Sequence, residues 1–265
     1  MRTIAHISDL HFGRVDPATA AALVEDLAAL SPSVLVVSGD FTQRARRREY
    51  SEAREYLGRL PRPQVLVPGN HDIPLYDVIR RFFFPLSRYR KYITSEMRPR
   101  FGDDELLVMG INSARSFTWK NGRISQEQLL DIRLHACPLP PGVFKVVVTH
   151  HPFIPPPGEL KKGIIGRSAM ALNEMEKCGV DMILSGHLHV GYSGDVRTHH
   201  EAVKRSILSV QAGTAISTRR RNEPNAYNLI TINSDHVTIA VRACSGGRFR
   251  QTEVTHYSKI DHAWV

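Results

Sequence analysis

The chain has 265 residues, of which 42% are hydrophobic and 23% are charged, so its composition is that of a globular protein with a substantial core. No stretch approaches the roughly 18 consecutive apolar residues of a membrane-spanning helix, and the first residues lack the apolar core of a signal peptide. The formal charge of +9 favours anionic ligands such as nucleotides, nucleic acid or lipid head groups, although a basic surface that only aids solubility would give the same balance.

Six short apolar runs predict buried strands. They are too short for buried helices and too uniformly apolar for strands with one face in water, so they fit strands that are covered on both faces. The runs are TIAHIS (3–8), SVLVVS (33–38), QVLVP (64–68), LLVMGI (106–111), KVVVT (145–149) and DMILS (181–185).

Amphipathic stretches with helix signals lie between these runs. The signals are an Asp16 N-cap followed by Pro17, an amphipathic run over 49–60, a capping box of Ser125 and Gln128, and a Ser168 cap with Gly179 at the end of its helix. Strand–helix–strand units of this length predict right-handed crossovers and a largely parallel sheet.

After about residue 205 the pattern changes to alternating apolar and polar residues with turn signals between the segments. This pattern, over about 205–258, predicts antiparallel strands that extend the sheet or form a second one. No internal repeat or linker divides the chain. We therefore expect one domain that comprises residues 1–265.

Polar side chains with metal-binding chemistry follow five of the six apolar runs, and three of these ends come directly after a glycine. In open α/β sheets the carboxyl ends of the strands line the ligand crevice, so we expect these side chains to lie together. Each pair taken alone would also fit a polar turn. The residues are Asp9, His11, Asp40, Asn70, His150, His187 and His189.

Two carboxylates, four imidazoles and one amide form a nitrogen and oxygen ligand set without thiolate. Such a set suits Mn²⁺ or iron, with Zn²⁺ or Co²⁺ as alternatives, better than a structural zinc site, which would use cysteine. Seven ligands are too many for one tetrahedral ion. If two ions share Asp40, each has four ligands and keeps open positions for water and substrate.

The motifs D-x-H, G-D, G-N-H-D, H and G-H-x-H occur in this order between residue 4 and about residue 192. Together they resemble the calcineurin-like metallophosphoesterases, whose fold implies an α/β protein: a four-layer α/β/β/α sandwich in a single domain. Within the family, the phrases HISDLHFG, GD, PGNHD and HHP are most similar to the class III cyclic-nucleotide phosphodiesterases and their bacterial relatives.

The resemblance implies a role for each matching residue. Asp9, His11 and His189 would bind the first metal ion, Asn70, His150 and His187 the second, and Asp40 both. His71 takes the family's catalytic position, and both Asn70 and His71 would contact substrate. His151 would lie beside the metal site, and Asp72 would either orient His71 or cap a turn. Gln43 stands where purple acid phosphatases have tyrosine, which argues against a Tyr–Fe³⁺ centre.

The predicted function is hydrolysis of phosphodiesters by attack of a metal-bridging hydroxide, with 3′,5′-cyclic nucleotides as the leading substrates. An alternative is a larger phosphodiester or pyrophosphate, such as a UDP-linked lipid A precursor, a glycerophosphodiester or nucleic acid. A third is a scaffold that keeps the fold without the chemistry, and the presence of all seven ligand positions and His71 argues against it.

One segment, about 80–125, is a candidate cap over the cleft. Its start, RRFFFPLSRYRKY (80–92), combines aromatic and basic residues. This start would contact substrate, lipid or nucleic acid, or else form a helix that buries Phe82–Phe84, which is the interpretation we favour.

The cysteine pattern bears on the cellular compartment. Cys137, Cys178 and Cys244 are odd in number and widely spaced, so we expect no disulfide framework and no zinc ribbon. A reducing cytoplasm is the predicted location. The oligomeric state stays open, with a homodimer as one option.

Overall fold

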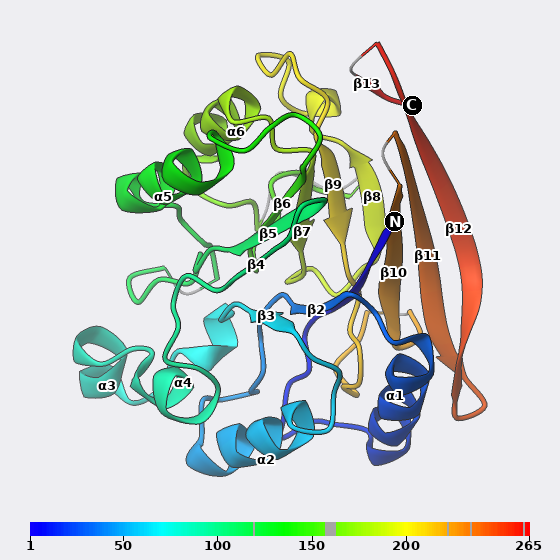
Figure 1. Cartoon of the computed structure of the whole chain (residues 1–265). Coiled ribbons are helices and arrows are strands. Elements are labelled where there is room, and N and C mark those ends of the chain that lie inside the picture. The colour runs from blue at the N-terminus through cyan, green and yellow to red at the C-terminus, as the bar shows by residue number, and fades with distance from the viewer. Residues whose placement is uncertain (119, 157–162, 222, 234, 262) are drawn as a thin grey trace.

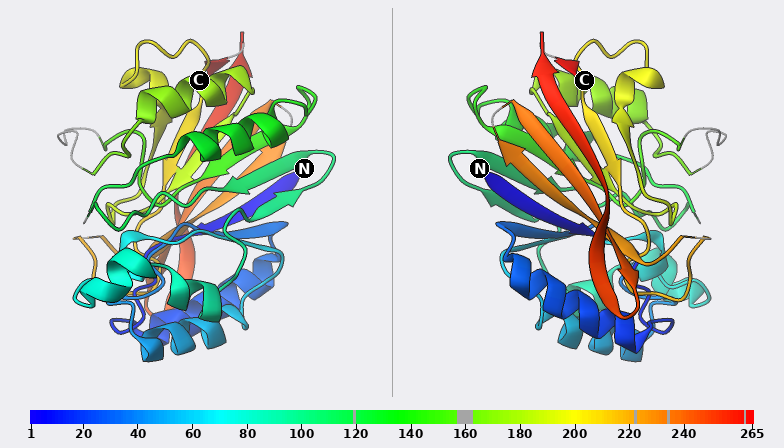
Figure 2. Two further views of the ribbon diagram at one scale, coloured as in Figure 1. Left: turned by 90° about the vertical axis from the view of Figure 1, so that its left-hand side faces the viewer. Right: turned by 90° about the vertical axis from the view of Figure 1, so that its right-hand side faces the viewer.

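The computed structural model describes residues 1–118, 120–156, 163–221, 223–233, 235–261 and 263–265. In these residues two β-sheets pack face to face, and helices cover the outer side of each (Figures 1 and 2). In spatial order the first sheet contains β13 (Ala263–Trp264), β12 (Arg248–Ile260), β11 (His236–Ser245), β10 (Ala226–Asn233), β1 (Arg2–Ile7), β2 (Val34–Val37) and β3 (Gln64–Leu66). The second contains β4 (Arg100–Gly102), β5 (Leu106–Gly110), β6 (Phe144–Val148), β7 (Met182–Ser185), β9 (Leu208–Gln211) and β8 (Tyr192–Asp195).

The helices divide between the two outer faces. The first sheet is covered by α1 (Pro17–Leu30) and α2 (Arg47–Leu57), with α3 (Val78–Phe83) and α4 (Ser87–Tyr92) following nearby, and the second by α5 (Gln126–Ala136) and α6 (Ser168–Lys177) (Figure 1). Short 3₁₀ turns occur at Asn70–Asp72 and Val196–Thr198. The four-layer α/β/β/α arrangement that the resemblance implied is therefore confirmed.

The uniformly apolar strands are explained by the two cores that they separate. Alternate residues of one strand point to opposite faces of its sheet. Val34 and Val36 of β2 belong to the core between the sheets, whereas Leu35 and Val37 belong to the core beneath α1 and α2. All four are fully buried, so the strand has no polar face.

The arrangement of the strands differs from the predicted one. The parallel strands do not form one sheet: β1, β2 and β3 pair in the first sheet, and β5, β6, β7 and β9 pair in the second. A strand that is buried on both faces has the same apolar sequence pattern in either sheet. The pattern therefore could not show which strands belong to which sheet. The antiparallel tail is confirmed for β10–β12, which extend the first sheet from β1. For β9 it is only partly right, because β9 runs antiparallel to β8 but parallel to β7.

The predicted helix signals are mostly confirmed. The Asp16 carboxylate accepts hydrogen bonds from the backbone of Ala18 and Thr19 at the start of α1, and the Ser125–Gln128 capping box opens α5. Ser168 is not a cap. Arg167 takes that place in a left-handed conformation, with φ of 65°, and its guanidinium donates to the carbonyl of Ile124.

Two further predictions about side chains are wrong. Phe82, Phe83 and Phe84 are 40%, 74% and 61% exposed, so this segment does not bury them. The ends of α5 and α6 bring Cys137 and Cys178 together in a disulfide across 41 residues of sequence. The spacing of the cysteines along the sequence could not reveal that contact. The predicted cytoplasmic location rested on unpaired cysteines, so the disulfide removes that argument. None of the helices in the described ranges is long and apolar enough to cross a membrane.

Candidate metal centre

The carboxyl ends of strands from both sheets meet at one edge of the sandwich. Within the first sheet, the amide of Asp9 after β1 donates to the carbonyl of Gly39 after β2, at 3.1 Å, and the amide of His11 donates to the backbone carbonyl of Asp40 at 2.9 Å. Between the sheets, the amide of His187 after β7 donates to Asp9 Oδ2 at 3.1 Å. The loops that carry the predicted ligands are thus tied to one another by hydrogen bonds.

Five of the seven predicted ligands have a left-handed backbone, which non-glycine residues adopt rarely. The φ angles are 55° for Asp9, 46° for His11, 53° for Asp40, 74° for His187 and 59° for His189. Each such residue costs on the order of 1 kcal/mol, and conformations of this kind gather at functional sites. At each of these residues the backbone therefore leaves the extended conformation of the preceding strand.

Two of the glycines at the strand ends are required because other groups approach them closely. A Cβ at Gly69 would lie 2.1 Å from Asp40 Oδ1, and a Cβ at Gly186 would lie 1.9 Å from Ser8 Oγ. Neither glycine has a left-handed backbone. Each is required because a side chain at its position would clash with its neighbours, and not because the backbone has to turn sharply there.

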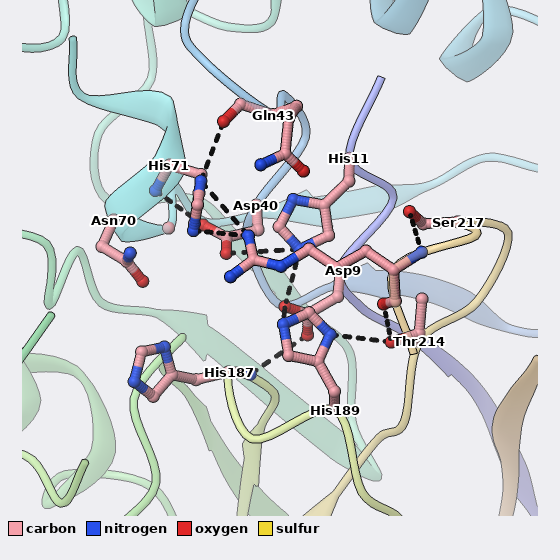
Figure 3. A network of polar contacts seen from close by, with 12 residues as sticks. Asp9, His11, Asp40, Gln43, Asn70, His71, His187, His189, Thr214 and Ser217 are labelled. Carbon is pink, nitrogen blue, oxygen red and sulfur yellow. Dashed lines mark hydrogen bonds and ion pairs between the residues drawn. The ribbon is translucent and has the colours of Figure 1, made fainter. Parts of the chain in front are cut away.

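The first group of converging side chains is Asp9, His11 and His189, whose ligand atoms lie within 4.8 Å of one another (Figure 3). His11 Nε2 and His189 Nε2 lie 3.5 Å and 3.8 Å from Asp9 Oδ1. Thr214 Oγ1 donates to a backbone carbonyl and therefore accepts from His189 Nδ1, at 2.8 Å. This bond leaves the lone pair of His189 Nε2 directed toward Asp9.

The second group forms around His150, which faces Asp40 and Asn70. The ligand atoms of His150, His151 and His187 lie within 4.8 Å of one another. His150 Nδ1 donates to the carbonyl of Ser38 at 2.7 Å, and its Nε2 lies 3.4 Å from Asp40 Oδ1 and 3.2 Å from Asn70 Oδ1. The rings of His150 and His187 have centroids 5.1 Å apart.

Asp40 faces both groups. Besides its contact with His150, its Oδ2 lies 3.7 Å from His11 Nε2. The structure thus brings all seven predicted ligands to one place, with Asp40 between the two groups, as a shared ligand requires.

Several buried polar atoms here have no hydrogen-bond partner. Among the described residues they include Asp9 Oδ1, His11 Nε2 and His151 Nε2. An unpaired buried polar atom is costly, and a carboxylate oxygen that faces imidazole nitrogens is the donor set that a divalent transition metal ion prefers. The residues present therefore fit bound metal. A separate group of Cys137, Glu174 and Cys178 does not, because both sulfurs are in the disulfide.

The electrostatics of the centre hold Asp40 and His187 in the protonation states that bind metal, but they favour a protonated His150. Burial would raise the pKa of Asp40, but His150 and His71 beside it hold that pKa well below its usual range. Burial lowers the pKa of His187 to about 3, with repulsion from His150 as the next cause. Burial opposes the charged form of His150 too, but the neighbouring Asp40 raises its pKa to about 9. A metal ion would have to displace that proton.

His71 lies at the rim of the centre, and its tautomer follows from its partners. Nδ1 donates to the carbonyl of Gln43 at 2.9 Å, and Nε2 accepts from Arg219 Nη1 at 2.7 Å, because a guanidinium can only donate. The amide of His71 donates to Asp40 Oδ1 at 2.9 Å. Burial lowers the pKa of the His71 ring, so the ring is neutral.

Two residues of the centre were missed by the sequence analysis. Thr214 orients His189, and Arg219 contacts His71. Both follow β9, the strand that was assigned to the antiparallel tail. No motif distinguishes Arg219 from its neighbours in the run of three arginines.

Asp72 does not contact the ring of His71. Its carboxylate accepts from the backbone of Phe41, Thr42 and Gly69, so it holds the loops after β2 and β3 together. Of the two roles considered for it, the structure supports the turn cap. His151 lies beside the centre, where its Nδ1 contacts Ser113 Oγ at 2.8 Å.

A cavity of about 620 Å³ opens beside His71 and Asn70. Its lining includes four cationic side chains, Arg14, Arg44, Lys120 and Arg219. No aspartate or glutamate of the described residues lines it. A cavity of this size accepts a nucleotide-sized ligand, and its lining favours an anionic one.

Comparison with known proteins agrees with this site. The model of the calcineurin-like phosphoesterase family matches residues 2–191. The chain belongs to the calcineurin-like phosphoesterase family.

Two curated relatives are similar over part of the chain. The glycerophosphodiester phosphodiesterase GpdQ of Enterobacter lignolyticus is 44% identical over 80 residues, which are 26% of this chain and 29% of the relative. A protein of Synechococcus named "probable cyclic nucleotide phosphodiesterase" is 33% identical over 81 residues, which are 27% of this chain and 32% of the relative. The matches thus span less than a third of each relative's length.

Solved structures share the fold at low sequence identity. A dimetal phosphatase from Danio rerio has a TM-score of 0.67 at 12% identity, covering 96% of this chain and 98% of its own. The purple acid phosphatase PPD1 of yellow lupin has a TM-score of 0.63 at 11% identity, covering 97% of this chain and 53% of its own. These likenesses bear on the fold alone.

Proposed function

We propose that the chain is a phosphodiesterase that uses two metal ions. Asp9, His11 and His189 would bind the first ion, Asn70, His150 and His187 the second, and Asp40 both. The observation that carries the proposal is the position of Asp40, whose two oxygens face His11 on one side and His150 on the other. Mn²⁺ and iron suit this ligand set best, with Zn²⁺ and Co²⁺ as alternatives.

Two such ions, when bound, supply a nucleophilic water at neutral pH and neutralise charge on the phosphoryl oxygens. The chain's own residues would bind and orient the substrate. Arg219, together with Arg14 and Arg44, would attract the anion into the cavity. In the structure Arg219 donates a hydrogen bond to His71 Nε2. A phosphoryl oxygen that attracts the guanidinium would break this bond and free His71 to contact substrate. Because Nε2 of the neutral ring carries no proton, it would first take one up from water. His71, with Asn70 beside it, would then stabilise or protonate a substrate oxygen.

The substrate we propose first is a 3′,5′-cyclic nucleotide. The cavity has room for a nucleoside beside the phosphate, and four cations line it. The relative from Synechococcus is named as a probable cyclic nucleotide phosphodiesterase. A glycerophosphodiester is the second candidate, because the similarity to GpdQ is higher.

A panel of substrates tests the proposal. Purified protein supplemented with Mn²⁺ is assayed on bis-p-nitrophenyl phosphate, p-nitrophenyl phosphate, cyclic nucleotides, a glycerophosphodiester and a nucleotide-linked lipid. We expect hydrolysis of diesters, with cyclic nucleotides preferred and little turnover of the monoester. A preference for the monoester would contradict the diesterase assignment, and a preference for the glycerophosphodiester would favour the second candidate.

The wider assignments from the sequence stay predictions. These are a single domain over 1–265 with a cap at about 80–125, a cytoplasmic location, and a homodimer. Limited proteolysis, fractionation of the native cells and light scattering would test them in turn.

A further inference from the structure

Half of the exposed large apolar side chains in the described residues gather in one place. Seven of 14 lie in the segment that starts at Tyr76 and in the neighbouring loop. We call these seven the apolar patch: Tyr76, Val78, Ile79, Phe82, Phe83, Phe84 and Phe117, with exposed fractions from 40% to 84%. A contiguous exposed patch of this kind marks an interaction surface more often than scattered apolar residues do.

A buried arginine fixes the helix that carries most of this patch, so that the apolar side chains stay exposed. Arg81, on α3, is only 2% exposed, and its guanidinium donates to the carbonyls of Pro74 and Thr118. Arg81 therefore anchors α3 to the protein in place of the phenylalanines. The rings of Phe82 and Phe117, with centroids 5.3 Å apart, join the two parts of the patch.

The patch is surrounded by positive charge. Besides the buried Arg81, residues 73–93 contain four arginines and lysines and a single acidic residue, Asp77, which pairs with Arg80 at 3.0 Å. Arg44 donates to the hydroxyl of Tyr76 at 3.2 Å and lies over its ring. Arg90 and Lys91 are exposed. Aromatic side chains next to cations are the composition of surfaces that bind anionic lipid bilayers.

We propose that the apolar patch docks the protein on the surface of an anionic phospholipid membrane. Ile79 and Phe83, 72% and 74% exposed, would enter the interface, and the surrounding cations would contact the lipid head groups. A second copy of the chain fits less well, because it would bring an equally cationic segment against this one.

This docking would place the cavity at the membrane surface. Tyr76 contacts Arg44, and Arg44, Ile73 and Leu75 line the cavity. The inference concerns where the protein binds, and it does not depend on the proposed chemistry.

Vesicle co-sedimentation tests the proposal. The intact protein is mixed with vesicles of phosphatidylcholine alone or of equal parts phosphatidylcholine and phosphatidylglycerol. We expect binding to the anionic vesicles only. The double variant Ile79→Ser, Phe83→Ser should lower the partition coefficient by about tenfold or more, because each side chain loses the free energy of leaving water. Both residues are exposed, so the variant should keep the wild-type melting temperature.

The matched control is Leu134→Ser on α5, which removes a side chain that is 59% exposed outside the patch. We expect it to bind vesicles like the wild type. Absence of binding by the wild type, equal binding to both vesicle types, or full binding by the double variant would overturn the proposal. A wild-type dimer that the double variant abolishes, without vesicle binding, would also overturn it and identify a second copy as the occupant.

Discussion

A methyl group at position 186 would test how closely the two sheets approach each other at the centre. In Gly186→Ala, the new Cβ would lie 1.9 Å from Ser8 Oγ and 2.6 Å from Asp9 Oδ2, and both of these residues are fully buried. The clash cannot be relieved by a flexible surface side chain, because Ser8 Oγ donates to Asp9 Oδ2 at 2.7 Å. Either Asp9 or the loop after β7 has to move.

The stability cost follows from overpacking, which is typically about 1–3 kcal/mol. A change of 1 kcal/mol shifts the melting temperature of a protein of this size by roughly 2–4 °C, so we expect a fall of about 2–12 °C. The fall in turnover should be more pronounced than the loss of stability. A displacement of about 1 Å at a catalytic site can lower the rate by roughly 100-fold, and Asp9 is a proposed metal ligand.

Three measurements on the same preparations separate these effects: thermal unfolding, metal content and turnover of bis-p-nitrophenyl phosphate. Gly142→Ala is the control, because nothing lies within 4 Å of a Cβ there, and it should behave like the wild type. Adding Ser8→Ala to Gly186→Ala removes the contact at 1.9 Å but keeps those with Asp9 Oδ2 at 2.6 Å and with the Cβ of residue 8 at 2.8 Å. Stability should therefore recover in part, and by more than turnover does. A Gly186→Ala variant with wild-type stability, metal content and turnover would refute this account.

Three other substitutions test the roles of single residues. Asp40→Asn should weaken binding of both metal ions, measured by metal analysis after dialysis, by more than the roughly 10–100-fold that loss of an outer-shell partner costs; loss of one ion only would argue against sharing. His71→Ala should keep its metal content while turnover falls by about 10²–10⁴-fold, and full activity would rule out the assigned role. Arg219→Ala should lower kcat/KM for a phosphodiester by about tenfold or more, mainly through KM, with partial recovery in Arg219→Lys; an unchanged KM would show that Arg219 does not bind the substrate.

Much of the candidate site could be predicted because it is built from residues at the ends of strands. Asp9 and His187 lie on different sheets, but each follows a recognisable apolar run, and the motif order places both at carboxyl ends. The helix starts at Asp16 and Ser125 were predictable because a cap is a local interaction.

What the sequence did not reveal depends on contacts between distant segments. Arg219 reaches His71 across 148 residues, and nothing in its own surroundings in the sequence marks it. Phe82–Phe84 were expected inside because burial usually follows hydrophobicity, but Arg81 takes the buried position through its hydrogen bonds to backbone carbonyls. The division into two sheets was hidden for a similar reason, since strands buried on both faces carry no sign of which neighbours they pair with.

The direct test of the central proposal is the number of metal ions that each chain binds. The protein is stripped with a chelator, reloaded with Mn²⁺, Zn²⁺ or Fe²⁺ in separate samples, dialysed and measured by inductively coupled plasma mass spectrometry, with Asp40→Asn prepared in parallel. The account predicts two ions per wild-type chain and a large loss from the variant. One ion or none in the wild type at saturating Mn²⁺, Zn²⁺ and Fe²⁺ would contradict it.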